Sequence, residues 1–289
     1  MKTAIRHKSA VAMLALLLSS AHPKVFAQGE GNSTVNCDAG GANLQTKLDN
    51  ASSGATVWVT GTCARGPYTI SKNISLTGFG TDGATLSAPN GTHVLIVQGA
   101  ILRLQDVRIN GGAGSGILVH GGQLFANRIV VEGAADHGVR LGVHSHGTIT
   151  NSTFRNNLFG IETAESSGAF LQGNTLEANR IAGLSVVRSS SAIVDGNTIK
   201  DNTVAGVVVD SNGSITLKNN SVTGNLSVGV LARRNGFLNT VTPANAFASN
   251  GTDVQCFERA IIDASDGPQQ PGGGTVDADT SCLIIGTMF

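Results

Sequence analysis

The chain contains 289 residues, of which 19 are basic and 19 are acidic, so its formal net charge at pH 7 is zero. Charged residues make up 13% of the chain and aromatic residues 4%, and no run of basic residues occurs. Because nucleic-acid binding relies on clustered positive charge, this composition excludes a typical DNA- or RNA-binding protein.

The N-terminus has the pattern of a secretory signal peptide. Lys2, Arg6 and Lys8 form a basic start, Ala10–Leu18 is an apolar run too short to span a membrane, and Ala27 ends a small-residue cleavage site. Cleavage there removes four of the 19 basic residues, which leaves 15 against 19 acidic residues and a net charge of −4. We therefore expect an exported protein, periplasmic or extracellular, without a membrane span.

Four cysteines lie near the two ends of the mature chain. Cys37 and Cys63 precede a repetitive region, and Cys256 and Cys282 follow it. Export favours disulfides, and the spacing suggests the pairs Cys37–Cys63 and Cys256–Cys282, although three connectivities are possible. Neither pair has the short spacing of zinc ligands.

A short helix is predicted between the first two cysteines. Leu44, Leu48 and Ala51 share one helical face, and Ser53 and Gly54 end the pattern. A repetitive fold must cover its first unit, because an open strand edge recruits other sheets. We therefore expect this helix to be an N-terminal cap.

The following region repeats a short strand pattern. Glycine begins similar segments every 23 residues, at Gly160, Gly183, Gly206 and Gly229, and earlier units keep a period of 22. Apolar and polar residues alternate within each segment, which is strand spacing, and a unit this short suits three strands wound as one coil of a parallel β-helix. We count about nine coils between Ala55 and Cys256.

Asparagines recur with the same period. A stacked Asn side chain can hydrogen-bond to the coils above and below, and Asn tolerates the left-handed backbone of a turn. The alternative is loop asparagines or glycosylation acceptors, since Asn151, Asn225 and Asn250 begin Asn-X-Ser/Thr sequences. We expect two ladders, with Asn174, Asn197, Asn220 and Asn245 in one and Asn157, Asn179, Asn202, Asn225 and Asn250 in the other.

These coils, with Gly61–Cys63 and Tyr68–Ile70 leading into them, resemble the right-handed parallel β-helix proteins of the pectate-lyase-like superfamily. Within it, they are similar to NosD-like periplasmic proteins and mannuronan epimerases. The resemblance runs from Leu44 to Cys256 and implies an all-β, right-handed solenoid of single-stranded coils with a short N-terminal capping helix. The predicted organisation is a signal peptide over residues 1–27, an N-terminal segment with the capping helix over 28–54, the β-helix over 55–257, and a C-terminal cap tied by a disulfide over 258–289.

Stacking brings polar residues from different coils into rows on the outer surface. One predicted row follows the glycine-initiated strands, and Arg140 and Glu162 occupy outward positions on adjacent coils. Alternating charges along such a row would form coil-to-coil ion pairs that contribute little individually. We expect this face to bind an extended carbohydrate polymer, with contacts from His120, His146, Glu162, Glu165, Arg188, Asp210 and Arg233.

An enzymatic alternative uses the same face. Uronate lyases and C5-epimerases need a base for the C5 proton and a cation beside the carboxylate. His137 or His144 could be the base and Arg140 the cation, and Asp136–Val139 is similar to a stretch of the mannuronan epimerases. The Asp-Pro-His motif of that family is absent, and the chain has a single tyrosine, Tyr68.

Two further interpretations concern the histidines. His120, His144 and His146 could bind a transition metal, which the resemblance to copper-associated NosD-like proteins favours. Otherwise they are solvated residues on a structural or adhesive surface protein. Our primary expectation has no cofactor, and the expected partner of a monomeric protein is a polysaccharide, with uronate-containing polymers as candidates.

Overall fold

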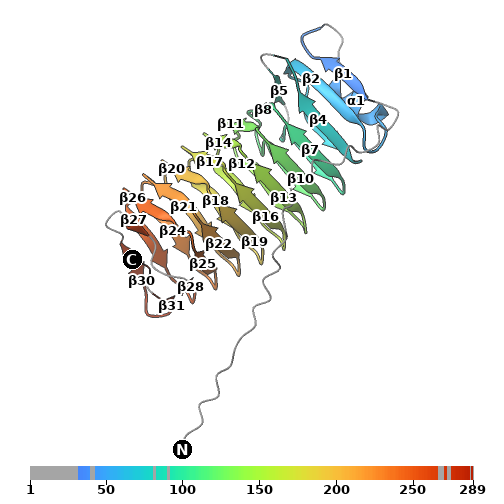
Figure 1. Ribbon diagram of the computed structural model, residues 1–289. Helices are drawn as coiled ribbons and strands as arrows, with labels where there is room; N and C mark the ends of the chain where they lie inside the picture. The colour runs from blue at the N-terminus through green and yellow to red at the C-terminus, as the bar shows by residue number, and fades with distance from the viewer. Residues whose placement is uncertain are drawn as a thin grey trace, which may run out of the picture.

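The computed structural model describes residues 32–39, 43–80, 83–89, 92–265, 270–271, 275–286 and 288. The predicted signal peptide lies outside the described residues. Successive coils stack along one axis into an elongated parallel β-solenoid, and a single helix lies at its N-terminal end (Figure 1). Among the described residues, no helix is long and apolar enough to cross a membrane.

Each coil contributes one strand to each of three parallel sheets, here called sheets A, B and C. Sheet A contains β1 (Ser33–Asn36), β2 (Thr56–Cys63), β4 (Ile74–Gly78), β7 (Ile101–Gln105), β10 (Gln123–Asn127), β13 (His146–Thr150), β16 (Gly168–Gln172), β19 (Ser191–Asp195), β22 (Ser214–Lys218), β25 (Phe237–Val241), β28 (Ile261–Ala264) and β31 (Leu283–Gly286).

Sheet B begins with the end of β2 and continues with β5 (Ala84–Ser87), β8 (Val107–Asn110), β11 (Val130–Glu132), β14 (Thr153–Arg155), β17 (Thr175–Glu177), β20 (Thr198–Lys200), β23 (Ser221–Thr223), β26 (Ala246–Ala248) and β29 (Gln270–Pro271). Sheet C contains β3 (Tyr68–Ile70), β6 (Leu95–Gln98), β9 (Ile117–His120), β12 (His137–Gly142), β15 (Phe159–Thr163), β18 (Ala182–Val186), β21 (Ala205–Val209), β24 (Val228–Ala232), β27 (Thr252–Cys256) and β30 (Val276–Ala278).

The coil count agrees closely with the sequence. Nine strands of sheet C, from β3 to β27, lie in the region where about nine coils were predicted, and β30 adds a tenth strand beyond Cys256. The register places Val207 of β21 opposite Leu184 of β18 and Val230 of β24, and all three are fully buried. The core is therefore a column of stacked apolar side chains.

Both predicted asparagine ladders are confirmed. In the first, the Nδ2 atom of Asn174 donates to Oδ1 of Asn197 at 2.9 Å, and Asn197 donates to Asn220 at 3.1 Å. In the second, Asn179 and Asn202 pair at 2.9 Å. These side chains are buried and hydrogen-bond between coils, so the structural interpretation of their period is correct.

Both ends are fastened as predicted. Helix α1 (Leu44–Asn50) begins after its N-cap Asn43, and Leu44 and Leu48 are buried against the first coils. The disulfides are Cys37–Cys63 and Cys256–Cys282. Disulfides form and persist in oxidising compartments, which fits a periplasmic or extracellular location.

Candidate functional site

The predicted site residues Arg140 and Glu162 face outward from sheet C on adjacent strands. Arg140 of β12 lies directly opposite Glu162 of β15. Their partners in the core, Val139 and Ile161, point inward and are fully buried. The strand alternation that fills the core therefore also fixes which charged side chains meet outside it.

His137 lies at the start of β12, and its ring is sandwiched rather than open to solvent. Only 5% of the residue is exposed, and the ring stacks on Phe159 with centroids 5.2 Å apart. Its Nε2 atom is 3.4 Å from Glu162, and its Nδ1 atom is 2.9 Å from the Asp136 carboxylate. The Nδ1 contact is electrostatic, because Nδ1 forms no hydrogen bond within the part of the chain that the structure describes.

Arg140 joins this histidine to a second carboxylate. Its guanidinium is 3.6 Å from Glu162 and 3.1 Å from Glu165, which also contacts Arg188 at 3.4 Å. Burial opposes ionisation of the Glu162 carboxyl, but the hydrogen bond from His137 and the charges of His137, Arg140 and Arg188 outweigh it. The pKa of Glu162 therefore lies below its ordinary value. We call Asp136, His137, Arg140, Glu162, Glu165 and Arg188 the sheet C cluster.

Asp210 organises a second charged group further along the same edge. It is 4% exposed, Arg233 contacts it at 3.0 Å, and Arg234 and Ser211 also bind its carboxylate. The expected coil-to-coil ion pairs therefore form between Glu165 and Arg188 and between Asp210 and Arg233.

The prediction of one continuous row needs correction, because neighbouring charges occupy different positions in the turn. Hydrogen bonds between coils align Glu165 and Arg188 with Ser211 and Arg234, whereas Asp210 lies one residue earlier. The spacing from Arg188 to Asp210 is one residue shorter than the coil there, which a fixed period misassigns. As a result, Asp210 turns inward to its arginines.

The remaining predicted histidines are dispersed. His120 ends β9 and is exposed, His144 lies in the turn after β12 with a positive φ of 57°, and His146 begins β13 on sheet A. Within the described ranges, no group of three or more His, Cys, Asp or Glu side chains is arranged to hold a metal ion. The structure thus gives no support to the metal interpretation of His120, His144 and His146.

One histidine near the cluster was missed by the sequence analysis. The Nδ1 atom of His93 accepts a hydrogen bond from the Ser115 amide at 3.0 Å. Burial lowers the pKa of His93, and Asp136, Arg140 and His137 all act on it electrostatically. His93, Ser115 and His137 are each one coil length apart, so the period itself could have placed His93 here.

The cluster contains more negative than positive side chains when its histidine is neutral. Asp136, Glu162 and Glu165 supply three carboxylates against the guanidinium groups of Arg140 and Arg188. Both nitrogens of His137 face carboxylates, which leaves little room for a substrate atom. The exposed atoms of the two arginines and Glu165 are the groups best placed to contact a partner.

Comparison with known proteins gives the family. The sequence profile described as "Right handed beta helix region" matches residues 92–246, more than half of the chain. The protein therefore belongs to the right-handed β-helix family, and the predicted handedness is confirmed. No curated protein sequence matches the chain.

Solved structures with the same fold are distant in sequence. An alginate lyase from Paenibacillus sp. str. FPU-7 has a TM-score of 0.71 and 15% identity, over 87% of this chain and 99% of its own. A pectate lyase has a TM-score of 0.61 and 12% identity, over 82% and 73%. Tailspike protein 2 from Escherichia coli O157:H7 bacteriophage CAB120 has 0.54 and 13%, over 86% and 46%. These likenesses establish a pectate-lyase-like fold.

Proposed function

We propose that the protein binds an extended polysaccharide along the outer face of sheet C and the adjoining turn, as an exported monomer. The observation that carries this proposal is the register of sheet C, which gives each coil one outward side chain at the same position. From Arg140 this row continues through Glu162, Ser185, Val208, Leu231 and Gln255. Parallel strands lie about 4.8 Å apart, so an extended chain of sugar rings can meet similar positions repeatedly.

The chemistry of this row suits a sugar polymer. Arg188 and Arg233 are 56% and 40% exposed at the turn beside it and can donate to sugar hydroxyls while they remain paired with carboxylates. Val208 and Leu231 provide a partly exposed apolar surface for the CH faces of pyranose rings. The names of the alginate lyase and the pectate lyase, which share the fold, support polysaccharide as the ligand class.

Affinity electrophoresis in gels that contain alginate, polygalacturonate or a neutral β-glucan tests the proposal. We expect retardation in at least one gel, and Arg188→Ala should weaken binding there roughly tenfold, as loss of a hydrogen bond from a charged donor does. Arg155→Ala on sheet B is the matched control, since it also removes an ion-paired arginine. Equal mobility in every gel would instead favour a structural or adhesive role.

The second candidate function is a lyase or C5-epimerase acting on uronates. The observation in its favour is the convergence of His137, Glu162 and Arg140 within 3.4 and 3.6 Å. Here His137 or the exposed His144 would take the C5 proton, and Arg140 would stabilise the charge that develops on the carboxylate. The burial of His137 requires its side chain or Phe159 to move before a substrate proton is within reach.

Two assays separate this candidate from binding alone. A lyase produces a 4,5-unsaturated sugar with ultraviolet absorbance, whereas an epimerase changes only the NMR spectrum of the treated polymer. Activity that disappears in His137→Gln and in Arg140→Lys, with binding retained, would establish catalysis. Retarded mobility without either product leaves the protein as a binding protein.

A further inference from the structure

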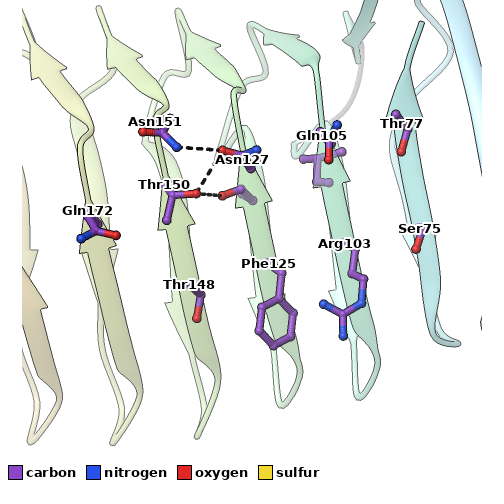
Figure 2. A pocket seen from close by; sticks show the side chains of 12 residues that line it. Ser75, Thr77, Arg103, Gln105, Phe125, Asn127, Thr148, Thr150, Asn151 and Gln172 are labelled. Atoms are coloured by element: carbon purple, nitrogen blue, oxygen red, sulfur yellow. Dashed lines mark hydrogen bonds between the residues drawn. The ribbon is translucent and has the colours of Figure 1, made fainter. Parts of the chain in front are cut away.

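A second surface lies on sheet A, away from the sheet C cluster. It is a depression of about 620 Å³ across β4, β7, β10, β13 and β16 (Figure 2). No acidic residue lines it, and Arg103 is its one charged lining residue. The lining residues are Ser75, Thr77, Arg103, Leu104, Gln105, Phe125, Ala126, Asn127, Thr148, Thr150, Asn151 and Gln172.

Arg103 is held in place by an aromatic ring. It lies directly opposite Phe125 on the next strand, and its guanidinium carbon is 4.5 Å from the ring centroid. Figure 2 shows the two side chains next to each other on the open face of the sheet. A guanidinium that stacks on a ring can still use its N–H groups to bind a carboxylate, and its restricted motion lowers the entropic cost of binding.

A parallel row of amides and hydroxyls runs beside this pair. The register aligns Thr77, Gln105, Asn127, Thr150 and Gln172 on five successive strands. Within the row, the Thr150 hydroxyl and the Asn151 amide both donate to Oδ1 of Asn127 at 3.1 Å. Amide and hydroxyl groups can donate and accept hydrogen bonds, as the recognition of sugar hydroxyls requires.

The spacing of the strands suits a polymer that runs along the solenoid axis. The outward row of Arg103 and Phe125 continues through Thr148 to Phe170. Two strand spacings separate Phe125 from Phe170, which is about 10 Å. This is comparable to the length of a disaccharide in an extended pyranose chain, so successive units can meet equivalent groups.

We propose that this groove is a separate binding site for a carboxylate-bearing polysaccharide. Arg103 binds a sugar carboxylate, the amide and hydroxyl row binds ring hydroxyls, and Phe125 is a positioning residue that orients Arg103. Nucleic acid fits this groove poorly, because one cation neutralises only one of its many phosphates. The site shares its ligand class with the proposed function but uses different residues on a different sheet.

Calorimetric titration of the full chain with oligogalacturonate, and with cello-oligosaccharide as the neutral probe, tests the site. We expect oligogalacturonate to bind at least tenfold more tightly, with an affinity that falls as salt increases. Arg103→Ala should weaken this binding roughly tenfold or more and remove most of the salt dependence. Phe125→Leu should weaken it less, since Arg103 remains but is less well oriented.

The controls distinguish this site from the sheet C face. Arg188→Ala and Arg155→Ala should leave oligogalacturonate binding unchanged, and thermal unfolding of each variant checks its folding. The proposal is wrong if wild type does not bind oligogalacturonate, if Arg103→Ala binds it normally, or if Arg188→Ala alone abolishes binding. In the last case the proposed function on sheet C stands and the groove does not.

Discussion

Individual asparagines connect the coils of this protein by hydrogen bonds that no apolar residue could replace. The Oδ1 atom of Asn197 accepts from the backbone and side chain of Asn174, both at 2.9 Å, and its Nδ2 atom donates to the Leu171 carbonyl at 2.9 Å. Each ladder asparagine thus satisfies buried backbone groups in turns where the sheet pattern is interrupted.

Replacement of one ladder asparagine should therefore be costly. Asn197→Ala leaves the Asn174 amide and the Leu171 carbonyl without these partners, so we expect the free energy of unfolding to fall by about 2–4 kcal/mol. Urea denaturation followed by circular dichroism measures the change. Asn239→Ala, the same substitution at an outward position of β25, should change stability by less than about 1 kcal/mol; equal losses would contradict the role of the ladder.

Asp210 should make stability depend on pH. Burial disfavours its charged form, but hydrogen bonds from Arg234 and Ser211 and the charges of Arg233 and Arg234 outweigh burial and hold the pKa of Asp210 below its ordinary value. Because the pKa is lower in the folded state, ionised Asp210 stabilises the fold above about pH 4, and this stabilisation is lost as the pH falls through the folded pKa.

The comparison that isolates this effect uses Asp210→Asn. The difference in free energy of unfolding between wild type and Asp210→Asn should be largest at neutral pH and should shrink at about pH 3, where both side chains are neutral. Urea titrations at the two pH values measure it, with Asp201→Asn as a solvent-exposed control. A difference that grows on acidification would show that the sign is wrong.

At the scale of elements, α1 completes the edge of a sheet. The Gln45 side chain accepts from the Thr69 amide at 2.8 Å and donates to its carbonyl at 3.1 Å, so it hydrogen-bonds to the free edge of β3 as a neighbouring strand would. Leu44 and Leu48 cover the apolar end of the first coils. The helix thereby removes an open edge that would favour association.

Weakening this cap should both destabilise and expose the first coil. Leu48→Ala is expected to lower the free energy of unfolding by about 2–4 kcal/mol, because it leaves a cavity under the helix. Light scattering after size-exclusion chromatography should also show more self-association than in wild type. The exposed neighbour Lys47→Ala is the control, and a monomeric Leu48→Ala protein of normal stability would argue against the capping role.

The strand pattern was predictable because the core constrains it, whereas the surface was less so. Inward positions such as Val207 must be apolar in every coil, and the asparagines must repeat to pair, so both leave a period in the sequence. Outward positions have no such constraint, and coil lengths vary. For this reason the sequence placed Arg140 beside Glu162 correctly but misaligned Asp210, and it did not reveal the pairing of Arg103 with Phe125.

At the scale of the whole molecule, the two candidate surfaces differ in charge. The sheet C cluster has an excess of carboxylates, whereas the depression on sheet A contains Arg103 and no acidic lining residue. A single elongated scaffold can therefore present different chemistry on different faces, because each sheet uses its own outward positions.

A stack of coils that contact only their neighbours should lose structure from its ends. The Cys256–Cys282 disulfide links β27 to the segment before β31, where Leu283 and Ile285 are 53% and 42% exposed and little core holds the strand. Replacement of both cysteines by serine removes a cross-link that contributes about 3 kcal/mol in loop-closure terms. We expect faster amide hydrogen exchange in β28, β30 and β31, with exchange in β18 and β21 unchanged.

Mass spectrometry of exchanged peptides measures this, and Cys37→Ser with Cys63→Ser is the matched control at the other end. That variant should accelerate exchange only in β1, α1 and β2, because several intact coils separate the two termini. Uniformly faster exchange in either variant would mean that the solenoid unfolds as one cooperative unit, and coil-by-coil stability would then be the wrong description.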